Sequence, residues 1–314
     1  FLKMIFKLLY LLIGVFSFYF IGNIFSQNFR KISNLSNQYI TASESIFIGL
    51  FLFGSFVFLF NFFYKINSLQ FLFATIFILI FFLLQLSNYK INNKHIKNIF
   101  IFTLISFPMI LSMDSGYDAG LYHVTYQKFI REEKIIFGIA NFHNVFGYSS
   151  FYEYLSAPIW MGNNLDNLAN LQLIFYISLF LFIYEVSKKS KQQSIYALII
   201  LFTIPFWLRY APIKWGLVDF PFGVVFFLSV LTSIFILKNN NKDESKHLFS
   251  VLIFLNCLTF FFKPGGFVVG LLTLFVIYIL LKRNFYDLKD LIKLLVLPFL
   301  VVSLWIFRGF ANTS

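Results

Sequence analysis

The segment that decides the fold is Met113–His123, which reads MDSGYDAGLYH and stands between two different kinds of sequence. Before it, and again after Asn167, long apolar runs recur along the chain. Runs of about 18 or more such residues are typical of helices that cross a bilayer. The segment 114–167 instead carries carboxylates, histidines and many tyrosines. The pattern predicts many membrane helices interrupted by one long loop, and that loop is where chemistry is expected.

Composition supports an all-α polytopic membrane protein. Hydrophobic residues make up 59% of the 314 residues and charged residues 12%, whereas soluble domains carry about 25% charged residues. The apolar runs are continuous and do not alternate, which argues against a membrane barrel. The net charge of +12 sits mostly in short loops, so we expect no nucleic-acid partner. The single cysteine, Cys257, lies in an apolar run and can form no intrachain disulfide.

Ten candidate membrane helices follow from the apolar runs. Their predicted ranges are 4–25, 46–63, 69–87, 98–113, 168–186, 194–208, 217–237, 248–262, 267–281 and 291–307. Basic residues set the orientation, because lysine and arginine are enriched in cytoplasmic loops. Placing Lys90, Lys94 and Lys97 in the cytoplasm puts the basic residues of 188–191, 238–246 and 282–289 there too. The outer loop 114–167 then faces the periplasm or its equivalent.

Two amphipathic helices are predicted at the membrane surface within this loop. The range 118–131 can turn one apolar face to lipid and keep polar side chains in water. A second helix is expected to begin at Ser150, because Ser150 and Glu153 have the spacing of a capping box. Farther along, Lys263-Pro264-Gly265-Gly266 is expected to end one helix before the next begins.

Asp118 and Asp114 are the first candidates for catalysis. A carboxylate just outside an apolar span is partly desolvated, which moves its pKa towards the range of a general base. The alternative is helix capping, since Asp ahead of a helix is a good N-cap. His123 would lie about 140° around a helix from Asp118, so the spacing enforces no metal site. We expect His123 and His143 to hydrogen-bond a ligand, with ordinary loop polarity as the alternative.

Several short segments, in order, resemble the GT-C superfamily of membrane glycosyltransferases. The segments 117–123, 141–143 and 149–151 resemble the first outer loop of that superfamily, closest to a bacterial branch, and include Tyr122 and Asn141. Three later segments resemble its other motifs: 214–219, 262–265 and 304–310. The resemblance covers about residues 98–314. It implies a GT-C-like catalytic core over 98–314, with 1–97 as additional N-terminal membrane helices.

The resemblance also implies an activity, namely transfer of a sugar from a polyprenyl-phosphate donor to a glycan or lipid acceptor. Asp118 matches the aspartate taken as the base, with Asp114 as the second candidate. Basic residues on the outer side could bind the donor phosphate, Lys263 and Arg308 first and Lys214 and Arg209 in reserve, with anchoring to lipid headgroups as the alternative. Tyr122, His123, Asn141 and His143 would contact substrate. Many relatives have a second acid after the first, but Ala119 stands here, so a divalent metal is left open and no ligand set is assigned.

The expected location is the bacterial cytoplasmic membrane, with the active face outside and membrane lipids as neighbours. Two other classes remain open. A transporter or flippase of lipid-linked sugars would need charged groups inside the spans, which here are almost purely apolar. A glycan polymerase or ligase would need basic residues in a late outer loop, where only Lys263 and Arg308 stand. Because the sequence begins at Phe1 and ends straight after an apolar run, we interpret it as a fragment.

Overall fold

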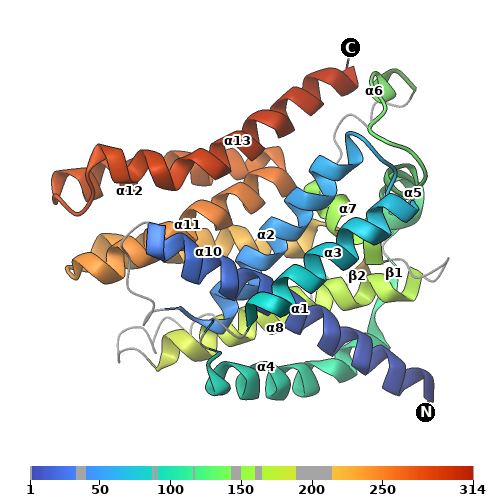
Figure 1. The fold of residues 1–314 in the computed structure, drawn as a ribbon, viewed down its shortest axis with the longest axis horizontal. Coiled ribbons are helices and arrows are strands. Elements are labelled where there is room, and N and C mark those ends of the chain that lie inside the picture. The colour runs from blue at the N-terminus through green and yellow to red at the C-terminus, as the bar shows by residue number, and fades with distance from the viewer. Residues whose placement is uncertain are drawn as a thin grey trace.

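The computed structural model describes residues 2–32, 40–86, 89, 91–115, 117–142, 150–159, 165–188 and 214–313. In these ranges the chain is helical apart from turns and one pair of two-residue strands (Figure 1). Seven of the described helices are long and apolar enough to cross a membrane. The prediction of an all-α polytopic membrane protein is therefore confirmed.

The seven helices match predicted spans. They are α1 (Leu2–Ile32), α2 (Ala42–Asn61), α8 (Leu168–Ser187), α10 (Asp219–Lys238), α11 (Lys242–Phe262), α12 (Phe267–Lys282) and α13 (Leu288–Thr313). Two further predicted spans form the apolar helices α3 (Leu69–Leu86) and α4 (Asn93–Ser106). The span predicted over 194–208 lies outside the described residues. The total of ten therefore stays a prediction.

Two helix ends show how local sequence sets length. The helix α4 gives way to a 3-10 helix over Phe107–Ser112, where Pro108 removes a backbone donor. The helix α11 begins at Lys242, six residues before its apolar run, because Asn241 caps it by accepting from the Asp243 and Glu244 amides. The predicted break after Lys263 is confirmed: α11 ends at Phe262 and a 3-10 helix over Pro264–Gly266 leads into α12.

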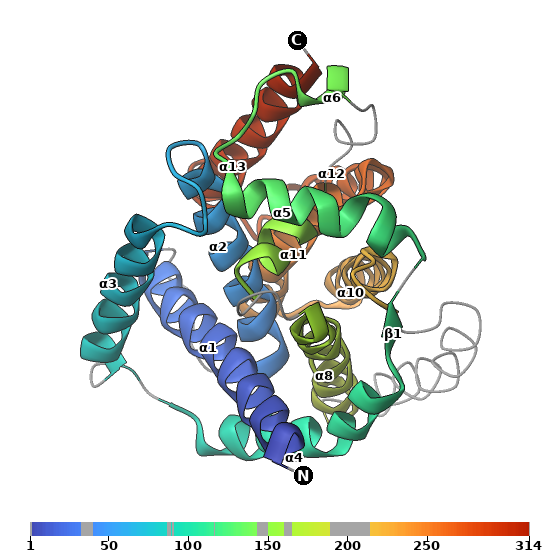
Figure 2. The ribbon, with the colours of Figure 1, turned by 90° about the vertical axis from the view of Figure 1, so that its right-hand side faces the viewer.

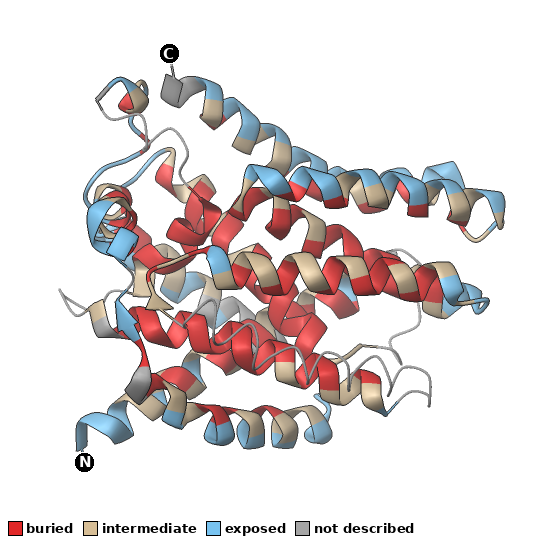
Figure 3. Cartoon of the chain, turned by 180° about the vertical axis from the view of Figure 1, so that it is seen from behind, coloured by how far each residue is buried: buried red, intermediate tan, exposed pale blue. Residues whose placement is uncertain are grey.

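The helix α2 lies at the centre of the bundle, against α1, α7 (Phe151–Ser156), α8 and α11. Its contact with α1 depends on two glycines. A Cβ on Gly22 would lie 2.7 Å from the Gly49 nitrogen, and a Cβ on Gly49 would lie 2.7 Å from the Phe18 carbonyl carbon. Small residues let membrane helices approach this closely. Figure 3 shows the buried residues concentrated in these central helices, while α12 and α13 expose much of their surface.

The short elements gather at one end of the bundle (Figures 1 and 2). They are β1 (Asp114–Ser115), a π-helix over Ala119–His123, α5 (Val124–Glu132), α6 (Ile139–Phe142), α7 with a 3-10 turn over Ala157–Ile159, and β2 (Lys214–Trp215). We call this the outer end, following the predicted orientation. Both helices predicted for the loop are present, and the first begins as a π-helix. All six residues of the second helix, α7, are buried, so the prediction that it lies at the membrane surface with a polar face in water is wrong.

Asn61, the last residue of α2, holds α5 against the membrane helices. It is 1% exposed, and its Nδ2 donates to the carbonyls of Ile130 at 3.1 Å and Glu133 at 2.9 Å. The central position of α2 thus links the first 97 residues to the outer end. The division of the chain at residue 97 stays a prediction.

Candidate functional site

Two short strands join segments that lie 100 residues apart. β1 pairs with β2 in parallel, and Asp114 stands opposite Lys214 in the register. Gly216 follows β2 with φ of +82°, and a Cβ there would lie 2.7 Å from the Ala119 Cβ. Only glycine suits both the backbone angle and the close approach. This turn therefore lies directly against the first turn of the π-helix, beside Asp118.

Tyr122 marks the centre of a cluster of carboxylates at the outer end. Its pKa is raised by burial first, and then by the charges of Asp118, Asp219 and Glu153 and a hydrogen bond with Asp118. These acids come from the start of the π-helix, from the first turn of α10 and from α7. We call Asp118, Tyr122, Glu153 and Asp219 the outer acidic cluster. Because its pKa is raised, the Tyr122 phenol stays protonated and can donate a hydrogen bond to a carboxylate.

Lys263 reaches this cluster through Asp219. The Lys263 ammonium forms an ion pair with the Asp219 carboxylate, and both side chains remain accessible, at 38% and 58%. Asp219 stands near Lys214 in the sequence, but the structure pairs it with Lys263, 44 residues along the chain. The ammonium also lies 5.9 Å from the ring centre of Phe222. A cation is thus held beside the acids while remaining within reach of a ligand.

His123 and Glu153 form a buried pair beneath the exposed acids. The His123 Nδ1 lies 2.7 Å from the Glu153 Oε1, and the two residues are 7% and 2% exposed. Glu153 also accepts from the Ser150 amide at 2.9 Å, which confirms the predicted capping box. Burial raises the pKa of Glu153, and His123 opposes that rise. This position favours a role for His123 in holding the π-helix against α7 over the predicted contact with substrate.

Arg308 is enclosed behind α5 and α7. Its Nε donates to the Tyr154 hydroxyl at 3.1 Å, its Nη2 donates to the Tyr126 hydroxyl, and its guanidinium lies 4.8 Å from the Trp305 ring centre. It is 2% exposed, and in the described ranges no carboxylate lies within ion-pair distance of it. The guanidinium ties α13 to the loop. Its predicted contact with a donor phosphate stays a prediction.

The remaining predicted residues are spread more widely. Asp118 and Asp114 are exposed, so the predicted partial desolvation of these two carboxylates is wrong, and Lys214 is half-buried. Asn141 is exposed in α6, which contacts α13 and lies apart from β1 in Figure 2. Arg209 and His143 lie outside the described residues. Among the residues that the structure covers, no group of three or more His, Cys, Asp or Glu side chains is arranged to hold a metal ion.

Membrane-spanning helices below an outer cluster of acids and a lysine define a multi-pass membrane protein with a polar site at one membrane face. The chain belongs to the family described as Domain of unknown function (DUF8201), whose model matches residues 4–313. No curated protein and no solved structure matches the chain. The family match runs from α1 to α13, so the first three helices and the outer acidic cluster belong to the same family unit.

Proposed function

We propose that this protein is an integral-membrane glycosyltransferase of GT-C type that uses a polyprenyl-phosphate sugar as donor. One observation carries the proposal: the charges of Asp118 and Asp219 both act on Tyr122, and the Asp219 carboxylate forms an ion pair with the Lys263 ammonium. A base and a phosphate-binding cation therefore share one outer cluster, although they come from segments 145 residues apart, from 118 to 263. The sugar and the acceptor are left open.

The chemistry assigned to these groups is a displacement at the anomeric carbon. Asp118 accepts the proton of the acceptor hydroxyl while the acceptor oxygen bonds to the anomeric carbon. The bond between that carbon and the phosphate oxygen breaks, and its electron pair leaves with polyprenyl phosphate. The Lys263 ammonium stabilises the charge on the leaving oxygens. Tyr122 orients Asp118 through its hydrogen bond, and Asp219 orients Lys263.

The basic residues predicted to bind the donor phosphate differ in the accessibility of their side chains. Lys263 and Lys214 are both partly accessible and belong to elements at the outer cluster, whereas Arg308 is enclosed by Tyr126, Tyr154 and Trp305. We therefore assign the donor phosphate to Lys263 first and Lys214 second. The site would face the outer side of a bacterial cytoplasmic membrane, because the basic loops lie at the opposite end of the bundle.

A transporter or flippase is the alternative, and the acids within the membrane helices bear on it. Glu44 and Glu185 are the two clearest cases, and both lie near helix ends. The Glu185 carboxylate accepts hydrogen bonds from the Ala42 and Ser43 amides at the start of α2. The Glu44 Oε1 lies 3.1 Å from the His247 Nε2 near the start of α11. Transport sites are typically near the midplane of the bilayer. The placement of these acids favours the transferase.

The test is transfer from radiolabelled polyprenyl-phosphate sugars, supplied as a panel to membranes that contain the full protein. Asp118→Asn should lower turnover by about 10²–10⁴-fold, the usual contribution of a general base. Glu133→Gln is the matched control, since Glu133 is an exposed acid just after α5 and outside the cluster. Unchanged turnover in a well-folded Asp118→Asn protein, or no transfer from any donor by the wild type, would remove the assignment.

A further inference from the structure

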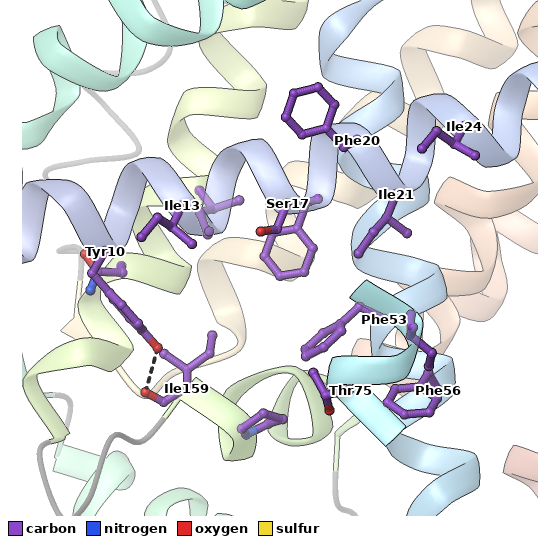
Figure 4. Close-up of a pocket in the computed structure, with 16 residues that line it drawn as sticks. Tyr10, Ile13, Ser17, Phe20, Ile21, Ile24, Phe53, Phe56, Thr75 and Ile159 are labelled. Carbon is purple, nitrogen blue, oxygen red and sulfur yellow. Dashed lines mark hydrogen bonds between the residues drawn. The ribbon is translucent and has the colours of Figure 1, made fainter. Parts of the chain in front are cut away.

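A second site lies on the other side of the bundle from the outer acidic cluster. It is a cavity of about 310 Å³ between α1, α2, α3, α8 and the 3-10 turn at Pro158 and Ile159. Figure 4 shows Ile21 of α1 on the same side of that helix as Phe53 of α2 and Thr75 of α3. Its size is at the lower end of the range of ligand cavities, about 300–1,000 Å³. The lining is almost entirely aliphatic and aromatic, so it suits a hydrocarbon chain.

One end of the cavity lies at the outer end of the bundle, next to the residues that follow α7. Ile159 follows α7, which carries Glu153, and the Tyr10 hydroxyl donates to the Ile159 carbonyl at 3.1 Å (Figure 4). From Tyr10 the lining residues continue along α1 to Ile24, a helical distance of about 21 Å. Half of a typical hydrocarbon core is about 15 Å. The cavity is thus long enough to take most of one lipid chain.

Asn170 supplies a polar group to this apolar lining. It is 2% exposed, it lines the cavity, and it is the third residue of α8, at the outer end of that helix. Within the described part of the chain, neither its Nδ2 nor its Oδ1 has a hydrogen-bond partner. A buried amide without partners is costly. The site therefore calls for a ligand that is apolar along its length and has a hydrogen-bond acceptor at one end.

We propose that this cavity binds a fatty-acyl chain of an ester-linked glycerolipid from the surrounding leaflet, with the ester carbonyl accepting a hydrogen bond from the Asn170 Nδ2. A polyprenyl phosphate also fits the apolar lining, but its acceptors are charged phosphate oxygens, which would have to lose their hydration to reach an amide that is 2% exposed. Position supports the same choice. α8 separates α1 from the β1–β2 pair, as Figure 2 shows. The lipid site is therefore distinct from the proposed donor site.

The experiment uses the full protein in vesicles that contain photoactivatable lipids. Three probes carry a diazirine in the hydrocarbon chain: an ester-linked phosphatidylcholine, its ether-linked analogue and a polyprenyl phosphate. The ester-linked probe should label peptides of α1, α3 and α8 more strongly than the other two. Ser17→Trp fills the cavity and should abolish that labelling. Leu9→Trp is the control, because Leu9 is a lipid-exposed residue of α1 that does not line the cavity.

Asn170→Leu separates the polar contact from the apolar lining. It should reduce labelling by the ester-linked probe about tenfold, equivalent to about 1.4 kcal/mol, and leave the ether-linked probe unchanged. If Ser17→Trp fails to fold, as judged by size-exclusion chromatography, the test rests on Asn170→Leu alone. The proposal is overturned if the polyprenyl probe labels the cavity best, if the two Trp variants are labelled alike, or if Asn170→Leu keeps the preference for the ester. None of these results depends on glycosyl transfer.

Discussion

The buried pair of His123 and Glu153 should make the largest single contribution to holding the outer acidic cluster in place. Its two side chains are 9% and 3% exposed and its Nδ1–Oε1 distance is 2.7 Å. His123 ends the π-helix that begins beside Asp118, and Glu153 also caps α7. Removing either partner therefore loosens the segment that carries Asp118 and Tyr122.

The expected magnitudes follow from burial. His123→Ala leaves Glu153 buried without its partner, and breaking such a pair costs about 3–5 kcal/mol. Glu153→Gln keeps the size and the capping contact but weakens the bond to His123, at about 1–3 kcal/mol. In the double variant both partners are replaced, so no buried charge is left without a partner. Its loss should fall below the sum of the two single losses by about 1–3 kcal/mol, as for other residues in direct contact.

The assay is unfolding in mixed detergent micelles with rising sodium dodecyl sulfate, followed by tryptophan fluorescence. Lys293 and Asp290 provide the control cycle, since they lie 3.6 Å apart on α13 with side-chain exposures of 46% and 34%. An exposed pair of this kind contributes at most about 1 kcal/mol. Additive losses at His123 and Glu153, as small as those of the control, would refute the claim that this pair is buried and coupled.

Three further predictions concern stability, each with its own measurement. Asn61→Leu removes the hydrogen bonds at 3.1 and 2.9 Å that hold α5, and should lower the unfolding free energy by about 1–3 kcal/mol while proteolysis within α5 increases. Gly49→Leu should cost about 1–3 kcal/mol or more in thermal unfolding, whereas Gly270→Leu, where an added Cβ has nothing within 4 Å, should cost little. In His123→Ala the pKa of Glu153 rises further, because the group that lowered it is gone. A raised carboxyl pKa contributes stability at low pH that is lost as the pH rises, so the defect of this variant should be smaller at about pH 5 than at about pH 8 in thermal melts.

Sequence patterns predicted what depends on neighbours along the chain. The capping box at Ser150, the helix break after Lys263 and the positions of the described spans all rest on contacts within a few residues. The length of a helix was predicted less well where polar residues extend the helix beyond its apolar run. The apolar run predicts that α11 starts at residue 248, but Asn241 caps the helix so that it starts at Lys242, six residues before, and no apolar signal marks that start.

Pairing between distant residues could not be read from the sequence. Asp219 had Lys214 as its near neighbour, yet its partner is Lys263, because the turn after α11 returns the chain to the start of α10. Glu153 was expected to act as a cap, and it does, but its second bond to His123 joins residues 30 apart. Arg308 was expected to face a ligand, whereas tyrosines from α5 and α7 enclose it. The only sequence signal for the last case was the repeated tyrosine in the loop.

The acids at the two ends of the bundle have different partners, and the difference bears on where the proposed reaction is assigned. At the inner end, both carboxylate oxygens of Glu185 accept bonds from the start of α2, and Glu44 is shared between its own capping box and His247. These oxygens are committed to holding helices together. At the outer end, Glu153 and His123 provide the same support below, while Asp118, Asp219 and Lys263 stay accessible above. A ligand can contact groups of the second kind without unfolding a helix end, which is why we assign the proposed reaction to the outer acidic cluster and Lys263.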